Sequence, residues 1–559
     1  MRIVVIGGVA GGMSAAARAR RLDESAEIIV FEKGPYVSFA NCGLPYYVGG
    51  EITSRDALLL HTPETLKSSL GLDVRPHTEV TSIDRAAKNV TVSGPHGVET
   101  VAYDALVLSP GANAFMPPIP GVDLPEVTHL RQVDDAIALA ERVAGARSAV
   151  VLGAGFIGLE TAEALKERGL DVALVEFAPQ VLPLLSPELS RLVELELTAN
   201  GVDVLTGVAA TAIEPAERGV TVTLSNGASA TVDIVVVSVG VRPNSGLAIA
   251  AGLDVDERGA ILVDGQQRTN DPSIWAVGDA IAVRNAVTGV MGPVPLAGPA
   301  NRQGRRAAEA IMGKTHEAKP VLGTAIVRVF GITAAVTGAS PRMLDQAGMD
   351  YVVHHTHHLD HAGYFPGAQQ VHLMGVFSPD GTLLGAQGVG REGVDKRIDV
   401  LATSLRAGFG ADDLAELELS YAPPFGSAKD PVNMLGFMMQ NTVQGTLKLW
   451  NASDLEWVRE NALIIDVRSA LEFDSGHLIE AVNVPHDEIR ENLDRIRGLA
   501  AGRPVRVHCA SGFRSYLAHR ILDQSGFDSA NFDGGMLTMK TALPDLELET
   551  GPALASVGA

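Results

Sequence analysis

The sequence predicts an α/β protein of several domains, in which two dinucleotide-binding units precede a smaller α/β unit. Three observations support this prediction. A strand, a glycine-rich turn and a helix open the chain, the same arrangement returns near residue 150, and a short strand runs into a cysteine at position 509. At 559 residues the chain is also too long for one hydrophobic core, since domains usually contain roughly 100 to 200 residues.

Composition and charge argue against nucleic acid and membranes as binding partners. The formal net charge is −22, which repels nucleic acid and acidic membrane surfaces. The chain contains no apolar run near the roughly 20 residues of a membrane-spanning helix, and its opening is a predicted strand and turn, not a signal peptide. We therefore expect a cytoplasmic protein that binds neither nucleic acid nor membrane and acts on a small molecule.

The first dinucleotide-binding unit begins with a β-branched strand over residues 2–6, a glycine turn and a helix to Leu22. A second strand over residues 27–31 leads to Glu32. Glycines let the backbone approach a pyrophosphate, the helix start supplies N–H groups, and the acid binds ribose hydroxyls. Val9 interrupts the usual G-x-G-x-x-G spacing. The turn glycines are Gly7, Gly8, Gly11 and Gly12.

The second unit has the intact spacing. A strand over residues 149–152 leads into the glycine turn, a helix extends to Lys166, and the next strand ends at Glu176. A carboxylate there repels a 2′-phosphate, so we expect NADH in preference to NADPH. Two Rossmann-like units indicate two dinucleotides, most economically FAD and NADH, although such a sheet can also bind none. The glycines are Gly153, Gly155 and Gly158.

Three later segments fit the places where the chain passes between these two units. Buried β runs over residues 103–109 and 232–239 each stop at a glycine, and the segment 269–279 ends a small strand on Gly278 and Asp279.

Together, G-G-V-A-G-G, G-A-G-F-I-G and I-W-A-V-G-D resemble the flavoprotein disulfide reductases over roughly the first 440 residues. The resemblance implies an FAD domain, an inserted NADH domain, a return to the FAD domain and a C-terminal dimerisation domain. It implies that Glu32 binds the adenosine ribose and that Asp279 holds the ribityl or phosphate region of FAD. Further implied cofactor contacts are Lys33, Val80, Gly111, Phe156 and Gly240.

Cys42 lies in the segment S-F-A-N-C-G-L-P-Y, which lacks the second cysteine that most of that family carries. The segment resembles the single-cysteine branch, which contains coenzyme A disulfide reductases, NADH oxidases and NADH peroxidases. A lone cysteine must complete its redox cycle with an outside thiol or with oxygen. We expect NADH to reduce the flavin and the flavin to reduce a sulfur bond on Cys42, with the flavin and the following helix lowering the pKa of the thiol.

Coenzyme A is the expected carrier of the substrate sulfur. Arg18 and Arg21 share a face of the first helix, as an anion clamp or as a solvated surface. The resemblance to coenzyme A disulfide reductases favours the clamp and implies coenzyme A contacts at Ser14, Arg18, Arg21, Ser38, Asn41 and Lys429.

Two tyrosines are candidate proton donors. The segments around Tyr364 and Tyr421 resemble the same subgroup, in which these residues reach the cysteine of a partner subunit. The resemblance therefore predicts a homodimer with shared active sites. Buried tyrosines bonded to the backbone are the alternative.

Residues 354–361 contain five histidines, a density that also occurs in metal sites. Strand alternation would divide these histidines between two faces, and no cysteine is close in sequence. We therefore expect a polar strand and no metal.

A compact C-terminal unit follows a mostly helical connector. A strand runs into H-C-A-S-G-F-R and then a helix, which would surround Cys509 with N–H groups that stabilise a thiolate or persulfide. Arg514 would close over an anion. With D-V-R at 466–468 and G-H-L-I-E-A-V-N-V-P at 476–485, the segment resembles the rhodanese domain, which implies sulfur transfer through a Cys509 persulfide. A phosphatase and an inactive rhodanese scaffold are the alternatives.

The whole chain resembles fusions of coenzyme A disulfide reductase and rhodanese. We expect an NADH-dependent reductase of coenzyme A persulfide, polysulfide and coenzyme A disulfide. The alternatives are an NADH oxidase or peroxidase that cycles Cys42 through sulfenic acid, and a sulfur-binding relay with a redox-sensing module. The predicted domains are an FAD-binding domain (1–113 and 269–321), an NADH-binding domain (114–268), an α+β dimerisation domain (322–440), a linker (441–452) and an α/β rhodanese domain (453–550).

Overall fold

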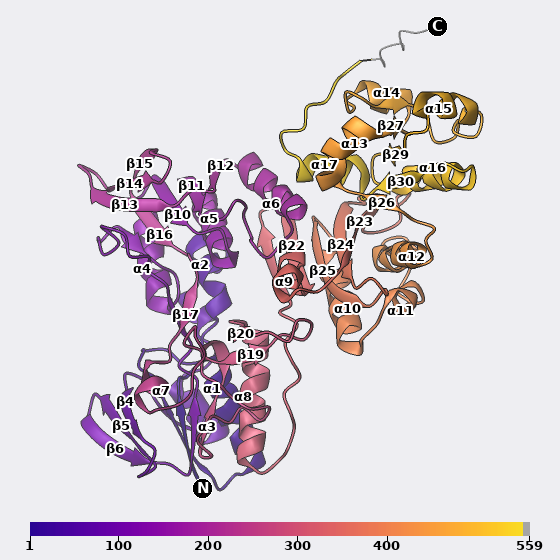
Figure 1. The fold of residues 1–559 in the computed structure, drawn as a ribbon. Coiled ribbons are helices and arrows are strands. Elements are labelled where there is room, and N and C mark those ends of the chain that lie inside the picture. The colour runs from indigo at the N-terminus through magenta and orange to yellow at the C-terminus, as the bar shows by residue number, and fades with distance from the viewer. Residues whose placement is uncertain (552–559) are drawn as a thin grey trace. The chain divides into compact units, whose positions relative to one another are not determined.

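The computed structural model describes residues 1–551, which divide into two compact units (Figure 1). The first unit holds residues 1–182 and 197–323, and the second holds residues 183–196 and the chain from Thr324 onward. Residues 183–196, inside the predicted NADH-binding range, thus pack within the second unit. Over residues 1–551, no helix combines the length and apolar character needed to cross a membrane.

The first sheet of the first unit is parallel, with the strand order β18-β7-β1-β2-β3. Its central strand β1 is buried nearly throughout, because α1 and α8 cover one face of the sheet and strands β4, β5 and β6 pack on the other. Its elements, with an adjoining antiparallel sheet of β4, β5 and β6, are β1 (Arg2–Ile6), α1 (Ala10–Leu22), β2 (Glu27–Phe31), α2 (Leu44–Gly49), α3 (Pro63–Leu70), β3 (Asp73–Arg75), β4 (Glu79–Asp84), β5 (Asn89–Gly94), β6 (Gly97–Ala102), β7 (Ala105–Leu108), β18 (Ile274–Ala276) and α8 (Ala297–Ile311).

The second sheet of the first unit repeats this plan, with the parallel strand order β12-β11-β10-β16-β9. An antiparallel sheet of β13, β14 and β15 packs beside it. The elements are β9 (Val127–Thr128), α4 (Val133–Val143), β10 (Ser148–Leu152), α5 (Phe156–Glu167), β11 (Asp171–Glu176), β12 (Val202–Thr206), β13 (Ala210–Pro215), β14 (Val220–Leu224), β15 (Ser229–Val232) and β16 (Ile234–Val237).

The glycine turns of these two sheets have the same backbone construction. Gly7 and Gly153 have φ values of +100° and +99°, which favour glycine. A Cβ on Gly12 would lie 2.0 Å from the carbonyl oxygen of Gly7, and one on Gly158 would lie 1.9 Å from that of Gly153. Only glycine lets helix and strand approach so closely, so both turns are built for a ligand at the helix start.

The second unit begins with an antiparallel sheet of order β21-β22-β25-β24-β23. Helices α10 and α12 cover its buried face and close its core. The elements are α6 (Pro187–Ala199), β21 (Ala325–Val329), β22 (Ile332–Gly338), α9 (Pro341–Ala347), β23 (Val352–Leu359), β24 (Gln370–Phe377), β25 (Leu383–Gly390), α10 (Val394–Ala407), α11 (Ala411–Ala415) and α12 (Pro431–Val443).

The C-terminal sheet is parallel, with the order β26-β30-β29-β27-β28. Two apolar clusters cover its faces, one of which includes Cys509. The elements are β26 (Leu449–Trp450), α13 (Leu455–Asn461), β27 (Leu463–Asp466), α14 (Ala470–Asp474), β28 (Val482–Asn483), α15 (Leu493–Ala500), β29 (Val505–His508), α16 (Phe513–Gln524), β30 (Ser529–Phe532) and α17 (Gly535–Ala542).

The histidine-rich stretch forms strand β23 and binds the C-terminal part of the chain. His355 Nδ1 lies 2.6 Å from Asp533 Oδ2 and its Nε2 lies 2.8 Å from Glu188 Oε1, while His357 Nε2 lies 2.8 Å from Thr538 Oγ1. Burial alone would lower the pKa of His355, but the two carboxylates outweigh burial and raise the pKa to about 10. These imidazoles therefore join β23 to α6 and to the C-terminal domain.

Candidate active site

Cys42 lies in a single 3₁₀ turn, Asn41–Gly43, directly before α2, and it is exposed. Partial burial of the sulfur is the main cause that raises the pKa of the Cys42 thiol, and the Glu160 carboxylate is the next. The Arg131 guanidinium lowers the pKa but does not offset them. The protein groups by themselves therefore do not lower this pKa, and the lowering expected from the flavin together with the following helix stays a prediction. The main physical reason is burial of the sulfur, and the carboxylates of Glu160 and Asp279 add to it.

Asp279 follows strand β18 in a short 3₁₀ turn, Gly278–Ala280. Its carboxylate forms an ion pair with Arg131, with Nη2 and Oδ2 2.8 Å apart. The Gly278 N–H donates to Gln303 Oε1 at 2.8 Å. The turn is therefore held by two side chains, Arg131 and Gln303, that the sequence analysis did not identify because no local motif contains them.

Glu32 and Glu176 have the same bonds in the two Rossmann-like sheets. Glu32 accepts from the N–H of Gly8 at 2.8 Å, and Glu176 accepts from the N–H of Ala154 at 2.6 Å. Each acid also accepts from the N–H two residues further along the chain. Both carboxylates are thus fixed beside their glycine turn, where a bound ribose would lie.

The irregular spacing of the first turn is compatible with a dinucleotide. A Cβ on Gly155, the middle glycine of the second turn, would meet nothing within 4 Å. Val9 stands at the corresponding position of the first turn, is half-buried and precedes α1 directly. The open space explains why a side chain fits there, and both turns fit FAD and a nicotinamide dinucleotide.

The other candidate cofactor residues are spread over several elements. Gly111 has φ +68° and Gly240 has φ +110°, and these glycines follow β7 and β16. Val80 is buried on β4, Lys33 is exposed after β2, and Phe156 begins α5.

The coenzyme A candidates on α1 contact α8. The Ser14 hydroxyl donates to Asn301 Oδ1 at 2.6 Å, and Arg18 pairs with Glu309 at 2.6 Å, with side chains only 18% and 12% exposed. Arg21 is exposed. The predicted two-arginine clamp therefore consists of one paired guanidinium and one solvated guanidinium. Among the other candidates, Ser38 donates its N–H to the carbonyl of Gly8 at 2.8 Å, Asn41 is half-buried and Lys429 is exposed.

Tyr364 and Tyr421 lie together in the second unit. Their hydroxyl oxygens are 3.1 Å apart, although the residues are 57 positions apart in sequence. Tyr364 is 76% exposed and Tyr421 is 49% exposed, so buried tyrosines bonded to the backbone are not what the structure contains. The hydrogen bond between the two hydroxyls raises the pKa of Tyr364, which keeps a proton available at this pair.

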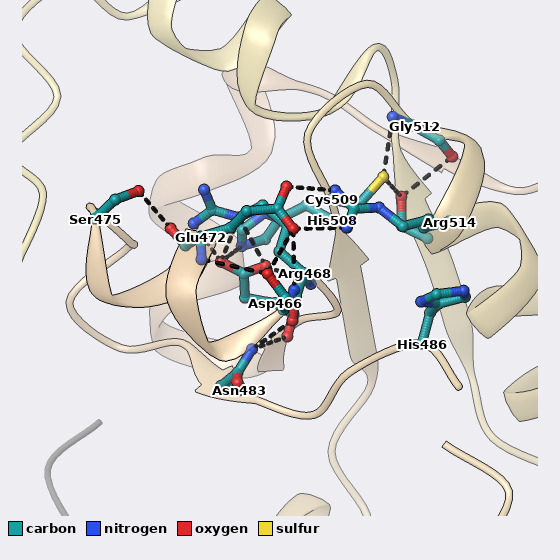
Figure 2. A network of polar contacts seen from close by, with 12 residues as sticks. Asp466, Arg468, Glu472, Ser475, Asn483, His486, His508, Cys509, Gly512 and Arg514 are labelled. Carbon is teal, nitrogen blue, oxygen red and sulfur yellow. Dashed lines mark hydrogen bonds and ion pairs between the residues drawn. The ribbon is translucent and has the colours of Figure 1, made fainter. Parts of the chain in front are cut away.

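Cys509 follows strand β29 at the bottom of a cup of hydrogen-bond donors (Figure 2). The side chain is buried, and its sulfur accepts from the Gly512 N–H at 3.2 Å and from the Ser515 hydroxyl at 3.2 Å. Gly512 has φ +96°, which turns the loop into the start of α16. This arrangement suits a thiolate or a sulfur-bound anion.

A buried ion pair and its partners tie the end of β27 to the segment after α14 and to β28. Asp466 and Arg468 form a bond of 2.6 Å, with side chains 0% and 7% exposed, and Arg468 also donates to the carbonyl of Gly476 at 2.7 Å. Asn483 donates to the carbonyls of Asp466 and Arg468 at 3.0 Å each (Figure 2). The D-V-R and G-H-x-x-x-A-x-N-x-P motifs are therefore bonded to each other within the C-terminal domain.

Arg514 is bound to another residue of the protein. Its Nη1 and Nη2 lie 2.7 Å and 2.6 Å from the carboxylate oxygens of Glu472 (Figure 2). Arg514, whose hydrogen bonds to this carboxylate are the main cause, lowers the pKa of Glu472 to about 2. Sequence analysis missed Glu472, although S-A-L-E at 469–472 has the spacing of a capping box and marks a helix start.

Comparisons with known proteins agree with this geometry. The family model described as pyridine nucleotide-disulphide oxidoreductase matches residues 1–304, and the rhodanese-like domain model matches residues 449–542. A coenzyme A disulfide reductase from Staphylococcus haemolyticus is 36% identical over 442 residues, 78% of this chain and 98% of that protein. An NADH oxidase from Methanocaldococcus jannaschii is 34% identical over 438 residues, 78% of this chain and 97% of that protein.

Two solved structures are similar over almost the whole chain. Reduced CoADR-RHD of Bacillus anthracis has a TM-score of 0.95 and 41% identity, and the comparison covers 98% of each chain. A NAD-dependent persulfide reductase from A. fulgidus has a TM-score of 0.91 and 40% identity, covering 96% of this chain and all of that chain. The family match implies FAD and NAD(P)H, which both glycine turns fit. The chain therefore belongs to the pyridine nucleotide-disulphide oxidoreductase family and carries a C-terminal rhodanese domain.

Proposed function

We propose that the protein is a cytoplasmic, NADH-dependent reductase of coenzyme A persulfide, polysulfide and coenzyme A disulfide. The observation that carries this proposal is the contrast between two free cysteines, Cys42 exposed without a second cysteine in its loop and Cys509 buried in a cup of donors. An exposed lone thiol suits a mixed disulfide with a small thiol, and the cup suits a bound persulfide. The similarity to a coenzyme A disulfide reductase and to a persulfide reductase supports both roles.

The proposed reductive half begins with the Cys42 thiolate. It attacks the inner sulfur of coenzyme A persulfide, CoA–S–SH, so that a Cys42–S–S–CoA bond forms and HS⁻ leaves. Two electrons and one proton then cleave the mixed disulfide into the Cys42 thiolate and coenzyme A thiol. Bound FAD supplies the electron transfer from NADH to sulfur. Glu176 favours NADH, because its carboxylate stands where a 2′-phosphate would be repelled.

The proposed sulfur-transfer half uses Cys509. Cys509 holds sulfane sulfur as Cys509–S–SH and passes it to the thiolate of coenzyme A, which regenerates the Cys509 thiolate and forms CoA–S–SH. The Gly512 N–H and the Ser515 hydroxyl stabilise the anionic sulfur during this exchange. The product is the persulfide that Cys42 attacks.

The proposal also assigns a proton donor and the residues that bind coenzyme A. We assign protonation of the departing thiolate to the Tyr364–Tyr421 pair of a second copy in a homodimer. Ser14, Arg21, Ser38, Asn41 and Lys429 are assigned to coenzyme A, together with Arg18 if coenzyme A displaces Glu309.

Steady-state NADH oxidation tests this function. We expect turnover with coenzyme A persulfide, polysulfide and coenzyme A disulfide, with one sulfide released per NADH for the persulfide. The similarity to the NADH oxidase from Methanocaldococcus jannaschii favours a second candidate, oxidation of NADH by oxygen or peroxide through a Cys42 sulfenic acid. Rapid oxygen or peroxide consumption without added thiol, and no sulfide release, would contradict the proposed reductase and support that candidate.

A further inference from the structure

The positive charge nearest the Cys509 cup is neutralised by Glu472. Both terminal nitrogens of Arg514 are bound to the Glu472 carboxylate, at 2.7 Å and 2.6 Å. The carboxylate also accepts from the N–H and the hydroxyl of Ser469, at 3.1 Å and 2.9 Å. Glu472 is thus held from two sides and engages both terminal nitrogens of Arg514, whose guanidinium also interacts with the Cys509 sulfur.

Exposed apolar side chains and a partly polar cavity lie beside the cup. Leu471 is 83% exposed beside Glu472, and Phe513 is 56% exposed beside Arg514. Ser511 and Phe513 also line a cavity of about 290 Å³, with His361 and Ser427 among its other walls. Exposed apolar side chains and a cavity of this size suit an organic group better than a small inorganic ion.

Sulfur donors differ in the charge of the group that departs when they transfer a sulfur atom to Cys509. With an organic persulfide, Cys509–S⁻ and R–S–SH form Cys509–S–SH and R–S⁻, so a single negative charge departs. With thiosulfate, Cys509–S⁻ and S–SO₃²⁻ form Cys509–S–S⁻ and SO₃²⁻, so a dianion departs. The second reaction needs an unpaired cation at the mouth of the cup, where the structure has a carboxylate on Arg514.

We propose that Glu472 makes Cys509 selective for organic persulfides over thiosulfate, by engaging Arg514 and by adding a negative charge at the mouth of the cup. The inference rests on the proposed sulfur-carrying role of Cys509. Glu472 is a specificity-determining residue, which changes which donor delivers the sulfur and does not itself react.

The test measures thiocyanate formation by the full-length holoenzyme, with cyanide as acceptor and either thiosulfate or glutathione persulfide as donor. We expect Glu472→Gln to lower the KM for thiosulfate on the order of tenfold, because Arg514 becomes free for the sulfonate oxygens. The kcat/KM for glutathione persulfide should change by less than about threefold. Glu472→Asp, which keeps the charge, should retain the preference of the parent protein.

Glu480→Gln is the matched control, because Glu480 pairs with Arg459 at 3.3 Å in the same domain. This variant should change neither the KM for thiosulfate nor the kcat/KM for glutathione persulfide. Equal changes for both donors in Glu472→Gln, or an unchanged KM for thiosulfate, would overturn the inference. A protein in which Cys509→Ser transfers sulfur as fast as the parent would instead overturn the sulfur-carrying role itself. Mass spectrometry of Cys509 after each donor provides a readout that does not depend on cyanide.

Discussion

The two cysteines of this chain occupy opposite kinds of surroundings. Cys42 is exposed in a one-turn segment, and the protein groups around it raise the pKa of its thiol. Cys509 is buried, with Gly512 and Ser515 donating to its sulfur. The donors to the Cys509 sulfur therefore come from its own domain, whereas the protein groups around the exposed Cys42 disfavour the thiolate. The comparison teaches that one fold places hydrogen-bond donors at one sulfur and raises the pKa of the other thiol.

The largest expected effect is on the exposed cysteine. Cys42→Ser should reduce NADH-driven sulfide release on the order of 10⁴-fold, because serine cannot form the mixed disulfide. Thiocyanate formation through Cys509 should remain near the parent rate. Paired assays of NADH oxidation and thiocyanate on the same preparation check both statements. Unchanged sulfide release in the variant would remove Cys42 from the mechanism.

The reciprocal change isolates the buried cysteine. Cys509→Ser should reduce thiocyanate formation on the order of 10³-fold, since no persulfide can form. The reduction of coenzyme A disulfide by NADH should change by less than about threefold, because that reaction needs only Cys42 in our proposal. If both activities fell together, the two sites would not be independent and the comparison would fail.

The next smaller expected effect is on the stability of the C-terminal domain. Asp466→Asn leaves Arg468 buried without its counter-ion and should destabilise the C-terminal sheet by about 3 kcal/mol, roughly a hundredfold in its folding equilibrium constant. Hydrogen exchange of β27 and β29 measures this loss. Asp73→Asn is the control, because Asp73 and Arg75 form an exposed pair whose loss should cost less than about 1 kcal/mol. Similar exchange in both variants would contradict the prediction.

The smallest expected effect is on the pKa of Cys42. Burial is the main cause of the raised pKa and the Glu160 carboxylate is the next, so Glu160→Gln should lower it. Below that pKa, a lower value means more thiolate, and alkylation by iodoacetamide near pH 7 should become about three- to tenfold faster.

The pH profile of labelling, followed by mass spectrometry in a Cys509→Ser background, should move to lower pH in that variant. Glu99→Gln is the control, because Glu99 lies on β6 and forms an exposed ion pair with Arg75. This variant should leave the pH profile of labelling unchanged. A profile that moved to higher pH would show that Glu160 does not act through its charge.

Local features of the fold were accessible from the sequence. The strands 2–6 and 27–31 and the end of the first helix at Leu22 agree with β1, β2 and α1, and α5 ends one residue beyond the predicted Lys166. The run predicted over 232–239 is instead two strands, β15 and β16, that meet at Asp233. The Asp233 carboxylate accepts from the N–H groups of Arg147 and Ser148. Asp233 is therefore bonded to the start of β10 at the point where β15 ends and β16 begins.

The sequence alone determined the two glycine turns, the lone thiol at Cys42 and the loop around Cys509, because each is encoded by neighbouring residues whose backbone geometry is local. Only the tertiary structure decided the partners of the charged groups. Glu472 lies 42 residues before Arg514, and Glu309 lies 291 residues after Arg18. No local sequence spacing predicts either pair. Whether an arginine is free for an anion depends on which carboxylate the fold brings beside it. The Cys42 region shows the same dependence, since the pKa of its thiol is raised first by burial and then by the Glu160 carboxylate, and the tertiary structure supplies both.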